Sequence, residues 1–269
     1  MNLPGDTDFF GWVMYLLGKY GPIFLHGAGV TLLLALVGTL IGCLIGLLVG
    51  VLRTLPLSPN ANPVVKVLHK ILQFILAAYI EIFRGTPMIV QAMVVYYGAM
   101  QVFKIDMSAM VAGFFVVSIN TGAYMAETVR GGIDSIDIGQ TEAAKAIGMT
   151  HWQTMISVIM PQTIRNIMPQ IGNNLIINIK DTSVLNVISV TELFFSGNSA
   201  AGAYFRYFEV FFIISTIYFI MTFTCSRLLR WIEHKIDGSS YYSLVKSDMM
   251  ADPTGHNPVK HGGTGTWKK

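Results

Sequence analysis

Long apolar segments separated by short polar breaks dominate the chain. Residues 23–52 contain no Asp, Glu, Lys or Arg, and their one histidine is His26. As a helix with a rise of about 1.5 Å per residue, this segment is longer than the roughly 30 Å hydrocarbon core of a bilayer. The complete pattern predicts an all-α membrane protein with five membrane-spanning helices, at about residues 23–52, 84–103, 107–130, 167–190 and 207–229.

Glycine recurs at every fourth position of the first apolar segment, at Gly38, Gly42, Gly46 and Gly50. On a helix this spacing places the four glycines along one face, where another backbone can approach closely. Glycine is common in spanning helices, but four glycines in strict register favour a packing surface.

Residues 64–83 allow two interpretations. Lys66 and Lys70 in the first turns and Glu81 near the end favour an interfacial helix that leads into the next span. The alternative is that this segment is itself a span, which would invert the topology of everything that follows. Residues 84–87, Arg-Gly-Thr-Pro, favour the first interpretation because they form a break followed by a proline at a helix start.

The composition agrees with an integral membrane protein. Hydrophobic residues make up 53% of the 269 residues and charged residues only 12%, half the share that is usual in soluble domains at about 25%. A net charge of +3 is too small to suggest nucleic acid as a partner. Cys43 and Cys225 both lie in apolar segments, which predicts free thiols. No cluster of His, Cys, Asp and Glu has the spacing of a metal site, so no metal is expected.

The basic residues are distributed unequally between the two sides of the predicted bundle. Only Lys19, Lys104 and Arg206 fall on one side. Because the side rich in Lys and Arg is usually cytoplasmic, the N-terminus is expected outside and the C-terminus in the cytoplasm. The basic residues of the cytoplasmic side, besides the lysines of the tail, are Arg53, Lys66, Lys70, Arg84, Arg130, Lys145, Arg165, Arg227, Arg230 and Lys235.

These inferences divide the chain into three parts. Residues 1–22 are expected to form an extracellular N-terminal segment, and residues 23–237 the transmembrane domain, which includes a cytoplasmic loop at 131–166. Residues 238–269 are polar and without periodicity, which predicts a disordered cytoplasmic tail.

The loop at 131–166 carries more helical order than a connection needs. It contains Glu142-Ala143-Ala144, then Gly148 after three residues and, nine residues further on, Val-Ile-Met-Pro ending at Pro161. The pattern predicts a helix, a glycine stop and a second helix ended by proline. Alanines are strong helix formers with little bulk, so such a helix can enter a partner's cleft, and Gly148 permits a sharp exit.

This spaced pattern resembles the signature loop of the membrane subunits of ATP-binding-cassette importers, whose version ends in Ile-x-Leu-Pro. The resemblance implies the type I importer fold, in which the loop forms a coupling helix that docks on an ATPase subunit. The residues that would couple to the ATPase are then Glu142, Ala143, Ala144, Gly148 and Pro161.

Three further motifs, at residues 81–87, 122–132 and 179–183, resemble the polar amino acid branch of that family, which serves histidine, glutamine, arginine and cystine. The resemblance implies a multi-pass protein of a prokaryotic inner membrane. Its implied partners are ATP-binding subunits, an extracellular or periplasmic substrate-binding protein and a second permease chain, identical or sister.

No Gly-x-x-x-x-Gly-Lys-Ser/Thr phosphate loop occurs in the chain, so it is not expected to be an enzyme. The chain is expected to bind no cofactor, and ATP with Mg²⁺ would be bound by the partner ATPase. The alternative is an ATP-independent secondary transporter of small polar solutes, although such proteins usually show internal repeats and more spans.

Polar side chains inside two predicted spans are the candidate substrate pathway. Asn120, Tyr124 and Glu127 are four and three residues apart and therefore share one helix face. Charges at membrane depth cost about 2.5 to 3.5 kcal/mol on insertion scales, so they usually face a cavity or pair with one another. In the functional interpretation, the carboxylates bind a substrate cation; in the structural one, Lys180 pairs with an acid at a subunit interface. The residues of the second span are Lys180, Asp181 and Thr182.

Overall fold

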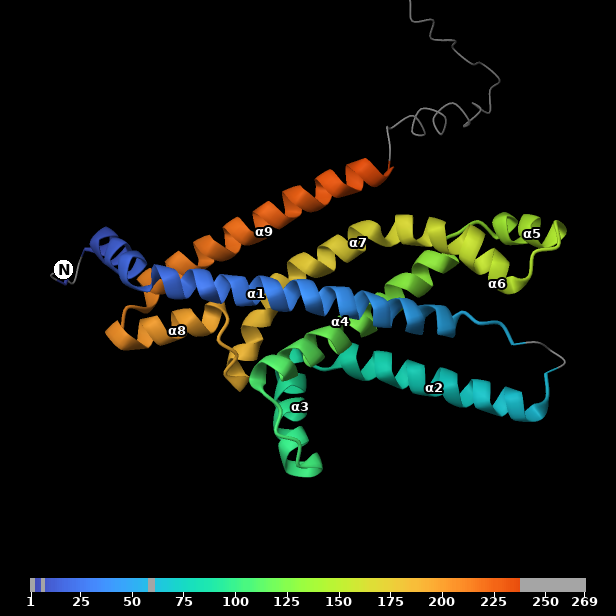
Figure 1. The fold of residues 1–269 in the computed structure, drawn as a ribbon, viewed down its shortest axis with the longest axis horizontal. Helices are drawn as coiled ribbons and strands as arrows, with labels where there is room; N and C mark the ends of the chain where they lie inside the picture. The colour runs from blue at the N-terminus through green and yellow to red at the C-terminus, as the bar shows by residue number, and fades with distance from the viewer. Residues whose placement is uncertain (1–2, 6–7, 58–60, 238–269) are drawn as a thin grey trace, which may run out of the picture.

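The computed structural model describes residues 3–5, 8–57 and 61–237, and the regular structure within these ranges is entirely helical (Figure 1). The predicted all-α class is therefore confirmed. By length and composition, α1, α2, α4 and α9 could each cross a membrane. The helices are α1 (Phe9–Arg53), α2 (Pro63–Gly85), α3 (Met88–Phe103), α4 (Ala109–Asp134), α5 (Ile138–Ala146), α6 (His151–Thr154), η1 (Met155–Ile159), α7 (Met160–Asp181), η2 (Thr182–Ile188), α8 (Leu193–Tyr204) and α9 (Tyr207–Asp237).

Helix α1 begins before the predicted span. The Asp8 carboxylate accepts a hydrogen bond from the backbone N–H of Gly11 at 2.8 Å and caps the helix, which then continues through Pro22 to Arg53. The predicted boundary between residues 22 and 23 is therefore wrong as a structural boundary. Proline lacks a donor but does not have to end a helix when packing holds the turns on both sides. At 45 residues and about 1.5 Å per residue, α1 is much longer than a hydrocarbon core.

The glycine face of α1 packs against α4. A Cβ atom added to Gly46 would lie 2.8 Å from the backbone carbonyl carbon of Met125, and one added to Gly50 would lie 2.7 Å from Cβ of Val129. These distances are shorter than side chains tolerate, so the two backbones approach as closely as they do only because Cβ atoms are absent. The predicted packing surface is confirmed, with α4 of the same chain as its partner.

For residues 64–103 the structure favours the alternative interpretation, in which the first of the two helices is the span. Helix α2 is long and apolar enough to cross a membrane, and it runs along the bundle beside α1 and α4 (Figure 1). Helix α3 stands crosswise to them and, at 16 residues or about 24 Å, is shorter than the hydrocarbon core. The lysines that favoured an interfacial helix lie in the first turns of α2, where they can reach the interface.

Both interpretations place the loop after α1 and the segment after α4 at the same end of the molecule. With α2 along the bundle and α3 crosswise, the loop after α1 and the segment after α4 lie at the same end of the molecule (Figure 1). Arg84, expected on the same side as Arg53, instead lies at the opposite end of α2. There its guanidinium carbon is 5.6 Å from the centre of the Tyr124 ring.

The predicted span at 167–190 also differs from the structure. Helix α7 ends at Asp181 and continues as the tighter helix η2, and helix α8 forms between the predicted spans at 167–190 and 207–229. The Glu192 carboxylate caps α8 by accepting hydrogen bonds from the backbone N–H groups of Phe194 and Phe195 at 2.8 and 2.7 Å. A capping acid that is fully buried was not evident from the sequence pattern.

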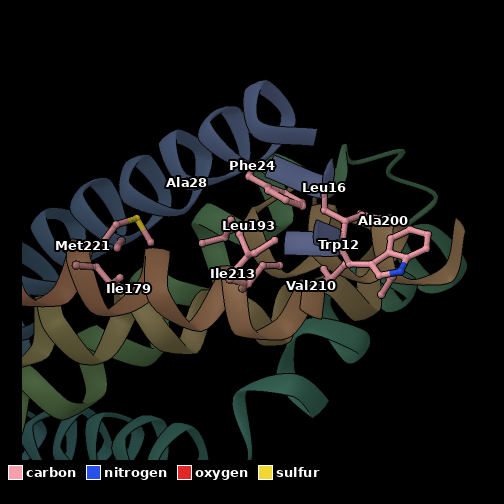
Figure 2. Close-up of a cluster of buried hydrophobic side chains, with 13 residues drawn as sticks. Trp12, Leu16, Phe24, Ala28, Ile179, Leu193, Ala200, Val210, Ile213 and Met221 are labelled. Atoms are coloured by element: carbon pink, nitrogen blue, oxygen red, sulfur yellow. The ribbon is translucent and has the colours of Figure 1, made fainter. Parts of the chain in front are cut away.

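The largest core joins α1 to α8 and α9 (Figure 2). Its side chains come from the first half of α1 and from segments almost two hundred residues later, including Trp12, Phe24, Leu193 and Ile213. This packing fixes α8 and α9 against α1 and leaves the middle of the bundle to α4 and α7. The predicted disordered tail, residues 238–269, lies outside the described residues.

Candidate functional site

A polar cavity of about 280 Å³ opens between α4, α7 and the junction of α2 with α3. Its volume is near the lower end of the range of small-molecule sites, about 300 to 1,000 Å³. The cavity contains the predicted pathway residues Asn120, Tyr124 and Asp181. The full lining is Thr86, Pro87, Met88, Asn120, Thr121, Tyr124, Asn174, Ile177, Asn178 and Asp181.

Hydrogen bonds hold two of the cavity amides in place. The Asn178 amide nitrogen donates to the hydroxyl oxygens of Thr39 at 2.8 Å and Thr121 at 2.9 Å, which ties α7 to α1 and α4. The Asn120 amide nitrogen donates to the side-chain oxygen of Gln91 at 3.0 Å and to the backbone oxygen of Phe83 at 3.1 Å. The polar wall is thus set before any ligand enters, which reduces the ordering cost of binding.

Asp181 is the one acidic side chain of the cavity lining. Its residue is exposed, and within the described part of the chain no hydrogen bond or ion pair engages its carboxylate. A carboxylate that forms no ion pair gives the cavity a negative charge that can attract an ammonium group.

The other residues predicted from the fourth span do not line the cavity. Lys180 precedes Asp181, is exposed and is absent from the lining. Thr182 is fully buried, and its hydroxyl donates to the backbone oxygen of Ile179 at 3.1 Å. On a helix, successive residues point about 100° apart, so three consecutive residues cannot all face one cavity.

Glu127 is placed outside the cavity, one turn beyond Tyr124. Its carboxylate contacts Arg53 at 2.6 Å and Arg130 at 2.9 Å. The shared helix face predicted for Asn120, Tyr124 and Glu127 exists, but its last member lies among cations of the protein itself. In this geometry Glu127 forms ion pairs within the protein and does not line the cavity.

Asn174 and Asn178 are cavity residues that the sequence analysis missed. Together with Asp181 they are spaced four and three residues apart, the same spacing that singled out the residues of α4. Applied to α7, this rule would have found them. Thr86 and Met88 reach the cavity from the α2–α3 junction, a contact for which the sequence holds no local signal.

The segment between α4 and α7 forms the expected helix and glycine stop. The Asp137 carboxylate caps α5 by accepting from the Gly139 N–H at 2.7 Å. At the other end, the N–H of Gly148 donates to Lys145 O and that of Met149 to Ala144 O, each at 3.0 Å, the hydrogen-bond pair of a Schellman motif. Gly148 has φ +83°, which only glycine adopts without strain.

The second helix does not end at Pro161. A capping box between Thr150 and Gln153 starts α6, and the helical run continues through the wider turns of η1 into α7. Pro161 lies in the first turn of α7. A proline cannot donate to the carbonyl of an earlier turn, and a short π-helical segment accommodates that missing donor within a continuous helix.

The exposed surface of this segment is more apolar than expected. Glu142, Ala143 and Gly148 are exposed, but Ala144 is buried. Large apolar side chains also point outward, which is costly at an end of a bundle that faces water unless another protein covers it. These side chains are Ile138, Ile147, Trp152 and Ile156, with 74%, 80%, 54% and 64% of their surface exposed.

A bundle with a polar central cavity and a helical, apolar-tipped segment at one end has a counterpart among known proteins. Residues 42–238 match the family described as "Binding-protein-dependent transport system inner membrane component". The chain belongs to this family. It is accordingly a multi-pass permease of an inner membrane, and the family does not support the alternative of an ATP-independent secondary transporter.

Curated relatives of the permease carry names from amino acid transport. It is 35% identical to the glutamine transport system permease protein GlnP of Escherichia coli (strain K12), covering 80% of this chain and 93% of that protein. It is 32% identical to the probable amino-acid ABC transporter permease protein PatM of Vibrio harveyi, covering 85% of this chain and 96% of that protein.

Solved structures agree with these relatives. A chain of an amino acid ABC transporter crystallised with histidines is 38% identical and superposes with a TM-score of 0.72 over 85% of this permease and 99% of that chain. A chain of the inward-facing MetNI methionine ABC transporter shares the fold at 19% identity, with a TM-score of 0.62 over 80% and 98% of the two chains. The type I importer fold is thereby confirmed for the permease.

Proposed function

We propose that this permease forms the translocation pathway of an ATP-driven importer for polar amino acids. The observation that carries the proposal is the cavity between α4 and α7, which combines one carboxylate, Asp181, with amides and hydroxyls. Amino acid transport is also the activity in the names of its relatives. In this role Asp181 binds the substrate's ammonium group, and the amides of Asn120 and Asn174 orient the rest of the molecule.

The energy comes from ATP-binding subunits in the cytoplasm, which hold ATP and Mg²⁺. They contact the permease through α5 and the turn at Gly148, with Ile147 and Trp152 as apolar anchors because both side chains are exposed. The N-terminus lies outside and the C-terminus in the cytoplasm. A substrate-binding protein delivers the amino acid from outside, and a second permease chain, identical or sister, completes the pathway.

The cavity proposal is tested by replacing Asp181 with Asn in the complete complex reconstituted in proteoliposomes. Loss of the carboxylate removes a charge-assisted contact worth about 1.5 to 3 kcal/mol, so the KM of uptake is expected to rise about tenfold or more. Asn173→Ala is the matched control, because Asn173 is an exposed residue of α7 outside the cavity lining. An unchanged KM in Asp181→Asn would remove Asp181 from the pathway.

The coupling proposal is tested by Gly148→Ala. A non-glycine residue at φ +83° is strained by roughly 1 to 3 kcal/mol, so the turn is expected to shift. Amino acid uptake should fall while the membrane-inserted protein remains at its normal level. Gly131→Ala is the control, because a Cβ at Gly131 in α4 meets no atom within 4 Å. Equal uptake in the two variants would contradict a role of this turn in coupling.

A further inference from the structure

Four charged side chains form a chain of ion pairs at the inner end of α1 and α4. One carboxylate oxygen of Glu127, Oε1, accepts from Nη1 of Arg53 at 2.6 Å. The other, Oε2, accepts from Arg130 through Nε at 3.2 Å and Nη2 at 2.9 Å. Arg130 in turn donates from Nη1 to Oδ2 of Asp134 at 2.9 Å. Both carboxylate oxygens of Glu127 are therefore occupied by arginines of the protein.

The position of these ion pairs along α4 shows which parts of the permease they connect. Glu127 lies three residues beyond Tyr124, which lines the cavity, and Asp134 is the last residue of α4, four residues before Ile138 begins α5. From Tyr124 to Asp134 the helix covers about 15 Å. The ion pairs thus lie between the cavity and the segment that faces the ATPase in the proposed function.

Arg53 adds the link to α1, of which it is the last residue. α1 and α4 are already held together by the close approach of Gly46 and Gly50 to Met125 and Val129. The pair of Arg53 with Glu127 adds an ionic contact beside this packing, at the last residue of α1. Only 25% and 22% of these two side chains is exposed, so solvent screens their attraction less than that of a surface pair.

A role of Glu127 as a substrate ligand fits this geometry poorly. Glu127 is absent from the cavity lining. A substrate cation would also have to displace Arg53 or Arg130 from an oxygen that each already occupies, and it would leave a partly buried arginine without its partner. The carboxylate is placed to hold the two helices.

We propose that Glu127 is a positioning residue that locks α4 to the last residue of α1, so that the two helices move as one body. A displacement of α5 by the ATPase is then passed through α4 to Asn120 and Tyr124 at the cavity. Without the lock, the end of α4 yields locally and ATP hydrolysis is no longer converted into a change at the cavity. This inference rests on the proposed function, because it assumes that α5 contacts an ATPase.

The test measures amino acid uptake and ATP hydrolysis in the complete complex in proteoliposomes. Glu127→Gln keeps the size of the side chain and removes its charge. The ratio of amino acid transported to ATP hydrolysed is expected to fall roughly five- to tenfold, at the lower end of the range of allosteric coupling. Asp134→Asn is the control, because Asp134 is 57% exposed and is paired within α4 alone; its ratio should remain normal.

Two substitutions at Arg53 separate the lock from general instability. Arg53 uses a single nitrogen, Nη1, so the one ammonium of Arg53→Lys can keep the ion pair and the normal ratio. Arg53→Gln should lower the ratio as Glu127→Gln does. The double variant Arg53→Gln/Glu127→Gln should be no worse than either single variant, because both remove the same contact.

The outcomes are distinct. A normal ratio in Glu127→Gln and Arg53→Gln would overturn the lock, as would independent, additive losses in the double variant. A raised KM for the amino acid with a normal ratio would return Glu127 to the substrate pathway. If Glu127→Gln is unstable in detergent melting, the comparison of Arg53→Lys with Arg53→Gln decides. If the proposed function itself is wrong, amino acid uptake by the wild-type complex will not depend on ATP.

Discussion

Helices α1 and α2 are neighbours in the sequence and differ sharply in how they are held. The second half of α1 packs closely against α4, with glycines at the contact and an ion pair at its end. α2 buries only Ile80. α2 is otherwise linked to the rest of the chain by individual hydrogen bonds, such as that from the Tyr79 hydroxyl to the backbone oxygen of Ile119 at 2.7 Å.

The difference shows what an apolar helix needs in a membrane. Burying leucine against another helix gains little there, because lipid tails are equally apolar, so association depends on close packing and on polar contacts. α1 has both. α2 has few of either and exposes apolar side chains such as Phe74, at 74%, and Ile82, at 57%. Its outer face is therefore suited to lipid or to another protein chain, whereas α1 and α4 form the rigid part of the permease.

The largest expected effect comes from breaking the contact of α1 with α4. Gly46→Leu adds a branched side chain where even a Cβ lies 2.8 Å from a backbone atom of Met125. Overpacking of this kind costs about 3 kcal/mol or more, so little folded protein is expected. The measurement is the yield of monodisperse protein in detergent together with its melting temperature.

Gly29→Ala is the matched control for that change. Gly29 lies in the same helix, and a Cβ there meets no atom within 4 Å. Normal yield is expected because the substitution also raises helix propensity. An equal loss of folded protein in both variants would show that the packed and open faces of α1 do not differ in their tolerance of an added side chain.

An intermediate effect on stability is expected from a substitution in α2. Ile80 is 1% exposed and packs against Val49 of α1 and Ala126 of α4. Ile80→Ala should lower the melting temperature by an amount that corresponds to about 2 kcal/mol, near the lower end for truncating a buried isoleucine. Phe74→Ala should change stability by less than about 0.5 kcal/mol in the isolated chain. A larger loss from Phe74→Ala would show that the outer face of α2 is covered.

The smallest of the three effects is expected for the side-chain hydrogen bonds that connect α7 to α1 and α4. Asn178→Leu removes the hydrogen bonds to Thr39 and Thr121. Hydrogen bonds between membrane helices contribute about 0.6 kcal/mol on average and up to about 1.7, so a loss of roughly 1 kcal/mol is expected in a denaturation curve. Asn173→Leu, on the exposed side of the same helix, should cause no loss. Equal losses in the two variants would show that the hydrogen bonds of Asn178 do not contribute to stability.

Local patterns predicted a large part of the fold and of the site. The glycine repeat of α1, the helix and stop at α5 and Gly148, and the cavity residues Asn120, Tyr124 and Asp181 were all readable because each depends on helical spacing or on the conformational freedom of glycine. What failed were decisions between two local patterns of similar strength. At residues 64–103 the apolar segments of α2 and α3 are alike, and only their packing shows which one runs along the bundle.

Charged residues show most clearly what could not be predicted from the sequence. The sequence established that Glu127 lies in an apolar segment and needs a partner, because an isolated charge there is too costly. It could not name the partner, since Arg53 is 74 residues away in the chain. Likewise the sequence alone determined an all-helical membrane protein with a structured loop, through hydropathy and periodicity. Only the tertiary structure decided which polar groups face the cavity and which face one another, because that depends on how the helices are rotated and packed.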